Sequence, residues 1–369
     1  MDKIRIGVSG VRRGTFVAHV CRCLEGANVT AVYDPVPETA QAVAATIDGC
    51  RAFVEGQWQV FLESGIEAVV VSPPVPFHVA QSVDCLERGL HVLSEVPAVA
   101  SIAEARALLR AVEHSKASYM LAENCNYLDE IELLRRMVAD GLLGDTYHAE
   151  GGYLHDCKFL WKNADGSLTW RGKGLYGVYC THTLGPLLSV LKDRIAQVSC
   201  LAQSGKMFDP DSPVICNYNL LMRTAAGKSV VVRVDAMSPR PYACDYRVQG
   251  TRGVYEFTFG QDTEPRVSLT GDHKWHGGGE FRAKYLSDRL AVPEEARKAG
   301  HGSMEYWMMK DWLEALRRGG PMPIDVHAAL DMTLPGIVAA ESARNHGQVL
   351  PVPDSRQWSQ DPVPASPEK

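Results

Sequence analysis

The sequence predicts an α/β protein in which a doubly wound parallel sheet is followed by an α+β domain with a large, mostly antiparallel, open-faced sheet. Over the first 125 residues, short apolar runs alternate with helical patterns, as is typical of βαβ units. After about residue 140 the pattern changes, because strand-like runs follow one another with a single helical pattern among them. The length of 369 residues also favours two cores over one.

Five short runs in the first part predict strands buried on both faces, because most of them are rich in β-branched apolar residues. These runs are residues 4–8, 29–33, 68–71, 91–94 and 119–122. The helical spacing around them predicts helices over residues 16–25, 37–47, 79–88, 102–114 and 128–140.

The second part is predicted to hold six strands with one helix among them and two helices after them. The strands are expected over residues 146–153, 195–202, 214–222, 229–236, 245–249 and 253–259, and the helices over 185–191, 303–318 and 326–344. A proline-rich end begins at Pro351 and is expected to form an extended strap or tail. We therefore expect a first domain over residues 1–125, a second over 126–350 that binds substrate and joins subunits, and a tail over 351–369.

Composition argues against several classes of function. A net charge of −6 and a pI near 6.1 disfavour nucleic acid, which attracts a basic face. No apolar run approaches the roughly 18 residues that a membrane span needs. Met1 leads almost directly into the first strand instead of a signal peptide, so we expect a cytoplasmic protein whose ten cysteines are thiols. Cys21 and Cys23 form the only tight pair, with no second pair at zinc-finger spacing, so no metal site is expected.

The first predicted strand runs into a glycine-containing turn, Gly7-Val8-Ser9-Gly10-Val11-Arg12-Arg13-Gly14. Glycines at such a turn let the backbone approach a pyrophosphate, and the helix that follows supplies partial positive charge at its N-terminus. With Gly10 as the first glycine of a dinucleotide-binding pattern, Arg12 stands at the second position and the third glycine, Gly14, comes one residue early. We predict a Rossmann domain whose cofactor contacts include Gly10, Val11, Arg12 and Arg13.

A carboxylate at the end of the second strand indicates which dinucleotide is expected. Asp34 lies 24 residues after Gly10, where it can accept hydrogen bonds from the adenosine ribose and would repel a 2′-phosphate. NAD is therefore favoured over NADP. Two alternatives stay open: Arg12 or Arg13 could pair with a phosphate, and Asp34 could be a turn residue before Pro35.

Ser72, Pro73 and His78 follow the strand over residues 68–71, at the sheet edge where the nicotinamide half of a dinucleotide would lie. Together with the glycine turn and the carboxylate, these features resemble the Gfo/Idh/MocA family, and the resemblance runs over residues 4–353. It implies NAD as cofactor, an activity on a sugar, and further cofactor contacts from Glu95 and Asn124.

The chain departs from that family's dehydrogenases at both positions of their proton relay. Their Glu-Lys-Pro segment, whose lysine is held to help handle the hydroxyl proton, is Glu95-Val96-Pro97 here. Their Asp four residues before a His is Val178, which precedes His182. A plain sugar dehydrogenase is therefore less favoured.

One branch, the NAD-dependent glycosidases of glycoside hydrolase family 109, known chiefly as α-N-acetylgalactosaminidases, is similar in several ordered blocks. The blocks in this chain are Ser94-Glu95-Val96-Pro97, Glu123-Asn124-Cys125-Asn126-Tyr127, Gly151-Gly152-Tyr153-Leu154-His155-Asp156, Trp170-Arg171, Tyr179-Cys180-Thr181-His182 with Leu184-Gly185-Pro186, Arg240-Pro241-Tyr242 and Gly300-His301-Gly302. The family's substrate-site residues correspond here to Glu123, Tyr153, Arg171, Tyr179, His182 and Tyr285. The chain differs from the branch at Asp156-Cys157-Lys158, in a shortened segment after Arg171, and at Ser303.

The resemblance implies a redox-neutral hydrolysis with a tightly bound, recycled NAD. The sugar is oxidised at C3, loses its C2 proton and its aglycone, takes up water and is reduced again. His182 is the expected base for the 3-hydroxyl, because its ordinary pKa suits proton transfer near neutrality, and Tyr179 could assist if its pKa is lowered. Tyr153 is expected at C2 or as a proton shuttle, and Arg171 at developing negative charge. The expected contacts to sugar hydroxyls or an anionic substituent are Glu123, Lys158 and Tyr285.

Simpler structural roles remain possible for these residues, and two further functions remain possible for the protein. Ordinary packing could account for Tyr153, mutual hydrogen bonding for Tyr179 and His182, a surface pair for Trp170 and Arg171, and a turn for His155 and Asp156.

The alternative functions are a sugar dehydrogenase in which His182 alone replaces the relay, and a catalytically silent NAD-binding sensor. An anionic hexose is a rival substrate, which Lys158, Lys162, Arg171 and Lys173 could bind. The expected partners are a small-molecule glycoside and further copies of the chain in a homodimer or homotetramer.

Overall fold

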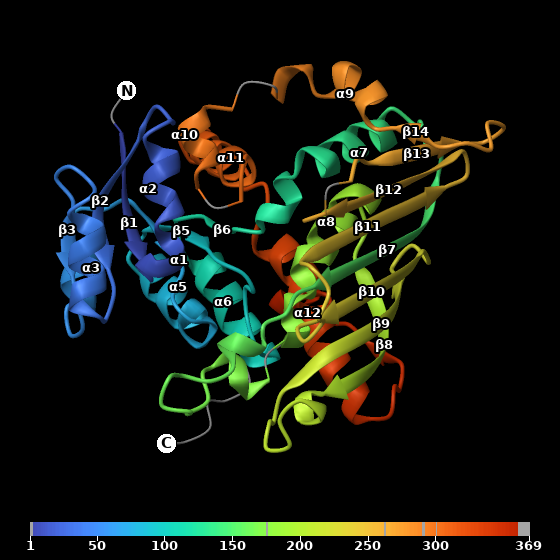
Figure 1. The fold of residues 1–369 in the computed structure, drawn as a ribbon. Helices are drawn as coiled ribbons and strands as arrows, with labels where there is room; N and C mark the ends of the chain where they lie inside the picture. The colour runs from blue at the N-terminus through green and yellow to red at the C-terminus, as the bar shows by residue number, and fades with distance from the viewer. Residues whose placement is uncertain (1–2, 175, 262, 290–291, 300, 361–369) are drawn as a thin grey trace.

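The computed structural model describes residues 3–174, 176–261, 263–289, 292–299 and 301–360, and it shows two sheets side by side with helices packed around and between them (Figure 1). The first sheet has six parallel strands in the order β3-β2-β1-β4-β5-β6. Its strands are β1 (Ile4–Ser9), β2 (Ala27–Tyr33), β3 (Arg51–Phe53), β4 (Ala68–Val71), β5 (His91–Ser94) and β6 (Tyr119–Leu121). Its helices are α1 (Val11–Gly14), α2 (Phe16–Cys21), α3 (Pro37–Ala44), α4 (Trp58–Leu62), α5 (His78–Glu87) and α6 (Ile102–His114).

This first sheet confirms the predicted doubly wound arrangement, and the order of its strands locates the site. The order reverses between β1 and β4, so the chain leaves their carboxyl ends in opposite directions and opens a crevice there. All four residues of β4 are buried, which explains its unbroken run of apolar side chains. The sequence interpretation missed β3 and α4, which have only three and five residues.

The second sheet has nine strands in the order β14-β13-β12-β11-β7-β10-β9-β8-β15. Its strands are β7 (Thr146–Leu154), β8 (Ile195–Ser204), β9 (Ile215–Thr224), β10 (Ser229–Asp235), β11 (Ala243–Gly250), β12 (Gly253–Phe259), β13 (Arg266–Leu269), β14 (His276–Gly277) and β15 (Leu350–Pro351). Neighbouring strands are antiparallel except for β7 and β10, which run parallel. The predicted large, mostly antiparallel sheet is confirmed, with three short strands that were not expected.

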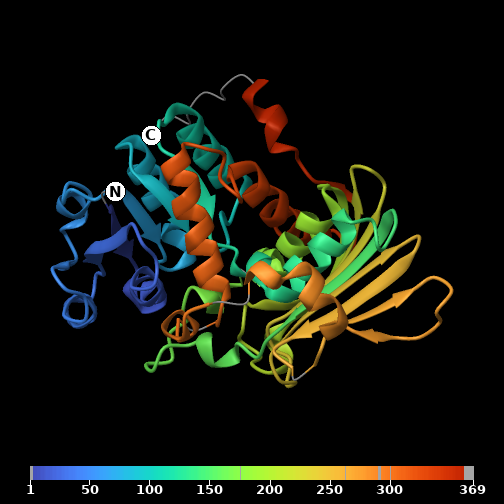
Figure 2. The same ribbon diagram turned by 90° about the horizontal axis from the view of Figure 1, so that it is seen from above.

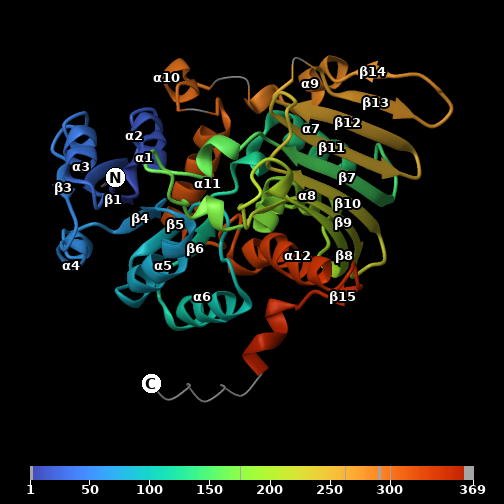
Figure 3. The ribbon, with the colours of Figure 1, turned by 60° about the horizontal axis from the view of Figure 1, so that its bottom comes forward.

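Helices cover one face of the second sheet and leave the other open (Figures 1 and 2). The helices of this part are α7 (Asp129–Ala139), α8 (Thr181–Leu191), α9 (Gly279–Tyr285), α10 (Glu294–Arg297), α11 (Met304–Arg318) and α12 (Val326–Arg344). Figure 3 shows the strands from β14 at one edge to β15 at the other, with α12 beside the β8 end. Leu201, Leu221 and Val231 are exposed on the open face. No helix of the described residues is long and apolar enough to span a membrane.

The last third of the chain returns to the first sheet. Leu121 at the end of β6 donates its backbone N–H to the carbonyl of Ile324 at 3.0 Å. The orange helix α11 lies between the two sheets, next to α2 (Figure 2). Side chains from the second half of the sequence therefore reach the cofactor edge of the first sheet.

Short 3-10 helices occupy several connections. They are η1 (Val75–Phe77), η2 (Asn124–Tyr127), η3 (Lys158–Leu160), η4 (Arg171–Lys173), η5 (Tyr176–Cys180), η6 (Gly205–Met207), η7 (Ser287–Arg289) and η8 (Ser355–Gln360). The last of these corrects the expected extended tail, because Asp354 accepts from the backbone N–H of Arg356 at 3.1 Å and so begins a helical turn. Residues 361–369 of the predicted tail lie outside the described part of the chain.

Candidate active site

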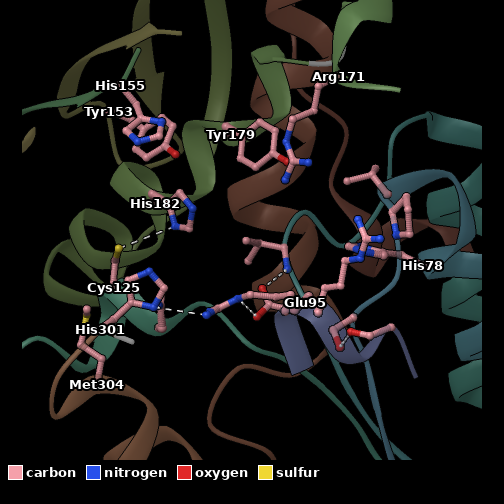
Figure 4. A pocket seen from close by; sticks show the side chains of 18 of the residues that line it. His78, Glu95, Cys125, Tyr153, His155, Arg171, Tyr179, His182, His301 and Met304 are labelled. Atoms are coloured by element: carbon pink, nitrogen blue, oxygen red, sulfur yellow. Dashed lines mark hydrogen bonds and ion pairs between the residues drawn. The ribbon is translucent and has the colours of Figure 1, made fainter. Parts of the chain in front are cut away.

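A cavity of about 930 Å³ opens at the carboxyl ends of β1 and β4 and is walled on its far side by the second sheet (Figure 4). Residues of both predicted domains line it: Gly10, Arg12, Arg13, Asp34, Ser72, Pro73, Pro74, Val75, His78, Glu95, Val96, Asn124, Cys125, Tyr153, His155, Trp170, Arg171, Tyr179, His182, Tyr242, Phe259, Gly260, His301, Gly302 and Met304. The volume suits a small-molecule site.

The glycine turn leaves bare backbone at the first-sheet end of the cavity. Gly10 has a φ of 78°, and a Cβ there would lie 2.4 Å from the backbone nitrogen of Pro73. A Cβ on Gly14 would lie 2.6 Å from the hydroxyl of Ser72. Ser72 fixes the turn by donating to the carbonyl of Ser9 at 2.7 Å. Val11 is buried beneath the turn and does not line the cavity, so its predicted role as a cofactor contact can rest only on its backbone.

Asp34 combines both of its predicted roles. Its Oδ1 accepts from the backbone N–H of Val36 at 3.0 Å, which makes it a turn residue. It also lines the cavity with 6% of the residue exposed. The carboxylate is therefore held in place by the turn while it faces the cofactor side of the cavity.

Arg13 lies within an ionic cluster that joins the two halves of the molecule, so it is not free for a phosphate. Its Nε lies 2.7 Å from Glu95 Oε1 and its Nη2 lies 3.5 Å from Glu305 Oε1. The same Glu305 oxygen lies 2.5 Å from His301 Nδ1 and accepts from Asn124 at 3.3 Å. Burial lowers the pKa of Arg13, but the two carboxylates outweigh it and raise this pKa above its ordinary value.

The sequence interpretation overlooked Glu305 as part of this cluster. It is fully buried on α11, between Met304 and Tyr306. A carboxylate within an otherwise apolar helical stretch was the available signal, because such a group is rarely buried without a partner.

His78 joins two loops at the nicotinamide end of the cavity. Its Nδ1 and Nε2 each lie 2.9 Å from a carbonyl oxygen, those of Pro97 and Pro73. Burial lowers the pKa of His78, so the ring is neutral and donates to one carbonyl at a time. Its role is to position the loop that carries Val96, whose side chain lines the cavity and can hold no proton.

His182 enters the cavity from the first turn of α8, with Glu123 behind it. Its Nδ1 lies 2.8 Å from Glu123 Oε1, and their side chains are 15% and 0% exposed. Burial lowers the pKa of His182, but the carboxylate of Glu123 more than compensates, and the net effect raises this pKa above its ordinary value. Glu123 does not line the cavity. Its predicted contact with a sugar hydroxyl is therefore corrected to an orienting contact with the imidazole.

The start of α8 is four residues earlier than expected, and this is what places His182 on a helix. Pro186 lies inside the helix and cannot donate to the carbonyl four residues before it, which is that of His182. The buried Tyr246 hydroxyl donates to this carbonyl instead, at 2.7 Å. The sequence interpretation began the helix at Gly185, one residue before Pro186.

Aromatic rings form the wall around His182 (Figure 4). The ring centroid of Tyr153 lies 4.9 Å from that of His182 and 6.2 Å from that of Tyr179. Burial raises the pKa of Tyr179 to about 12 and that of Tyr153 well above its ordinary value. The condition that Tyr179 has a lowered pKa is therefore not met. His155 lines the same wall, and burial lowers its pKa.

Arg171 reaches the cavity from η4, with its guanidinium carbon 4.0 Å from the ring centroid of Trp170. The stacked pair is thus part of the cavity wall and not a surface pair. Lys158, a predicted substrate contact, does not line the cavity, because its Nζ lies 2.8 Å from Asp156 Oδ2 and donates to the carbonyl of Met237 at 3.1 Å.

Tyr285 is a further predicted substrate residue that the structure places elsewhere. It lies on α9, against α7, and its hydroxyl donates to Asp140 Oδ2 at 2.6 Å. This hydrogen bond holds α9 on α7 at the far edge of the second sheet (Figure 1). The sequence could not show this, because Asp140 is 145 residues away along the chain.

Within the described part of the chain, one group of potential metal ligands stands out, namely Glu123, Cys125 and His182, with donor atoms within 4.8 Å of one another. Cys125 Sγ lies 3.6 Å from His182 Nδ1. The ion pair between Glu123 and His182 already accounts for this arrangement, and the predicted absence of a metal stays a prediction.

A doubly wound sheet whose crevice is closed by a second, open-faced sheet is characteristic of two-domain NAD-binding enzymes. The profile of the oxidoreductase family with an NAD-binding Rossmann fold (GFO_IDH_MocA) matches residues 4–123, and that of the GFO/IDH/MocA C-terminal domain matches residues 131–256. The chain belongs to the Gfo/Idh/MocA family. The profile of the glycosyl hydrolase 109 C-terminal domain matches residues 217–359, so the resemblance to that branch is confirmed at the level of this domain.

Individual relatives point the same way. A glycosyl hydrolase family 109 protein of Shewanella pealeana is 27% identical over 96% of this chain and 86% of its own. An alpha-N-acetylgalactosaminidase of Shewanella oneidensis is 26% identical over 96% of this chain and 85% of its own. Two solved structures, an oxidoreductase domain protein from Kribbella flavida and levoglucosan dehydrogenase with NADH and levoglucosan, each have a TM-score of 0.81, at 20% and 17% identity, and each match covers 96% of this chain and 100% of the other. These solved structures establish the fold.

Proposed function

We propose that this protein is an NAD-dependent glycosidase that oxidises its sugar transiently at C3 and keeps its NAD bound from one turnover to the next. The observation that carries the proposal is the pair of His182 and Glu123 at the cavity shared by the two sheets. Valines, Val96 and Val178, stand at the two positions of the dehydrogenase relay, and their side chains cannot transfer a proton. The match to the glycosyl hydrolase 109 domain supports a glycosidase.

The first-sheet end of the cavity fits NAD. Gly10 lines the cavity without a side chain, and a Cβ there would collide with the backbone of Ser72 and Pro73, so the turn presents bare backbone to a pyrophosphate. Asp34 is placed to accept from ribose hydroxyls, and Asn124 and Glu95 lie further along the same wall. When bound, NAD would accept a hydride from the sugar and later return it.

His182 is the proposed base for the sugar hydroxyl. If Nδ1 carries the proton that is donated to Glu123, the lone pair of Nε2 is free to take the hydroxyl proton. The carboxylate of Glu123 then stabilises the imidazolium that forms. This stabilisation is the same effect that raises the pKa of His182.

The remaining proton transfers fall to the aromatic wall. Tyr153 and Tyr179 stay protonated near neutrality, because burial raises both pKa values, so they act as hydrogen-bond donors or proton shuttles. A neutral imidazole is the better base for the C2 proton, and the pKa of His155 is lowered chiefly by burial. Arg171 faces the same space.

The experiment is a screen of 4-nitrophenyl glycosides with the enzyme as purified and no added NAD. We expect nitrophenol release over many turnovers without net NADH at 340 nm. A product formed in D₂O should carry deuterium at C2, because that proton is removed and replaced. Release with protium alone at C2 would indicate either direct displacement by paired carboxylates or return of the abstracted proton without exchange.

A sugar dehydrogenase is the second candidate, and the single histidine base is compatible with it. Such an enzyme would consume added NAD⁺ in proportion to sugar and form NADH. A silent NAD-binding sensor would do neither.

We further propose a cytoplasmic homodimer or homotetramer joined through the open sheet face. Sedimentation measures the mass in solution, and the mass of a single chain would contradict this assembly.

A further inference from the structure

The cavity has an uneven distribution of charge. Among the described residues, the acidic side chains that line it are Asp34 and Glu95, and both belong to the first-sheet half. Asp34 is engaged with the turn, and Glu95 pairs with Arg13. The wall formed by the second half carries Arg171 and three histidines, and none of its lining residues that the structure describes is acidic.

Arg171 is the one side chain of this wall with a permanent charge and no carboxylate partner in the described part of the chain. It stacks on Trp170 and lies beside the hydroxyl of Tyr179, whose pKa it lowers against the larger effect of burial. The stacking fixes the plane of the guanidinium, which is the geometry that binds an anion through two parallel hydrogen bonds.

The three lysines near Arg171 in the sequence are all excluded from the cavity. Lys158 pairs with Asp156, and Lys162 Nζ lies 2.6 Å from Asp209 Oδ2. Lys173 is exposed and does not line the cavity. The basic cluster in the sequence therefore reduces to a single cation in the site.

His155 and His182 lie on the same wall as this cation. Burial is the main reason why the pKa of His155 is lowered, and the neighbouring charges of Arg171 and His182 lower it further, against the opposing effect of Asp156. A neutral sugar would leave this charge uncompensated within a partly enclosed site, whereas an anionic group would neutralise it.

We propose that the sugar recognised by this enzyme carries an anionic substituent (a carboxylate, sulfonate or sulfate) that binds to Arg171, with the sugar ring against the tyrosines of the aromatic wall. This inference rests on the proposed glycosidase function for the identity of the ligand as a sugar. The recognition itself follows from the charge of the cavity and can be measured without turnover.

The test is calorimetric titration of the NAD-loaded enzyme at low salt with two matched sets: glucose, glucuronate and glucose 6-sulfate, and galactose, galacturonate and galactose 6-sulfate. We expect an anionic member to bind more tightly than its neutral counterpart. In Arg171→Gln this preference should fall by about 10- to 100-fold, the usual worth of a hydrogen-bonded ion pair. Comparison of carboxylate and sulfate tells which anion the site prefers.

Lys173→Gln is the matched control, because it removes a cation two residues away that does not line the cavity. It should bind anionic sugars like the parent protein. Thermal unfolding and NAD content establish that Arg171→Gln is folded and loaded.

Three results would overturn the inference: neutral sugars binding as tightly as anionic ones, an equal loss for both in Arg171→Gln, or a loss of NAD from that variant. The equal loss would assign Arg171 to the ring or to catalysis, and the loss of NAD would assign it to the cofactor. If no aryl glycoside is turned over while the anion preference holds, the proposed glycosidase function fails and the anion site stands.

Discussion

His182 has a buried carboxylate directly behind it, with Glu123 Oε1 2.8 Å from its Nδ1. Glu123 sets the tautomer and the charge of this ring. The aliphatic residues at positions 96 and 178 cannot take part in proton transfer. His182→Gln keeps hydrogen bonding but removes proton transfer. Turnover should fall by roughly 10²–10⁴-fold, the usual contribution of a positioned acid–base group. NAD content after gel filtration should be unchanged, and near-normal turnover would move the base to another residue.

Glu123 can be tested through pH dependence. Its carboxylate raises the pKa of His182 against the effect of burial, and Glu123→Gln leaves the burial while removing the charge. The pKa of His182 should therefore fall. Because a base works only when deprotonated, the acidic limb of the kcat/KM profile should move to lower pH. An unmoved limb would show that His182 is not the titrating base.

Asp34 has one oxygen bound by the turn, and this permits a clean separation of its two roles. Asp34→Asn retains an acceptor for the backbone N–H of Val36 and removes only the charge. The variant should keep its melting temperature, hold NAD less tightly and discriminate less against NADP. Competition binding of the two dinucleotides measures this, and unchanged discrimination would leave Asp34 as a turn residue only.

At the scale of elements, the helix that presents His182 depends on a bond from outside it. The buried Tyr246 hydroxyl donates to the carbonyl of His182, which Pro186 leaves without a helical N–H partner. Tyr246→Phe should destabilise the protein by about 1–3 kcal/mol, the cost of an unsatisfied buried acceptor. Adding Pro186→Ala supplies the missing N–H and should recover part of that loss in urea unfolding. If the double variant loses the sum of the two single effects, the Tyr246 hydrogen bond and the missing N–H of Pro186 are not coupled.

Elements with a strong local pattern could be predicted from the sequence, and the others could not. Five strands of the first sheet were found because apolar residues dominate each run, and the long helix α12 because its helical spacing covers 19 residues. The short β3, β13 and β14 have too few residues for a pattern, and their pairing depends on neighbours far along the chain.

The candidate site shows the same division between local and long-range information. Gly10, Asp34 and Arg171 line the cavity as predicted, because motifs place them at strand ends or beside a stacking partner. Lys158 and Tyr285 were wrong as cavity residues, since each is held elsewhere by a hydrogen bond or ion pair that depends on the tertiary fold.

At the scale of the whole molecule, the cluster of Arg13, Glu95 and Glu305 connects the glycine turn to α11 across the cavity. The carboxylate of Glu305 is fully buried, so its charge depends on Arg13, His301 and Asn124 for compensation. Since the cluster lies where the cofactor edge meets the second half of the chain, we expect an intact cluster to slow the release of NAD. It would give the proposed retention of the cofactor a structural cause that is separate from the contacts of the turn.

Glu305→Gln should therefore release NAD about tenfold faster or more. Breaking a buried ion pair usually costs several kcal/mol, and we expect part of this cost to destabilise the NAD-bound state. Glu295→Gln is the matched control: it removes an ion pair that also joins the first domain to a late helix, between α2 and α10, but outside the cavity. Dilution into excess unlabelled NAD after loading with labelled NAD measures both rates. Equal rates in the two variants would mean that the cluster supports the fold without closing the cofactor site, and retention would then have to come from the glycine turn and Asp34 alone.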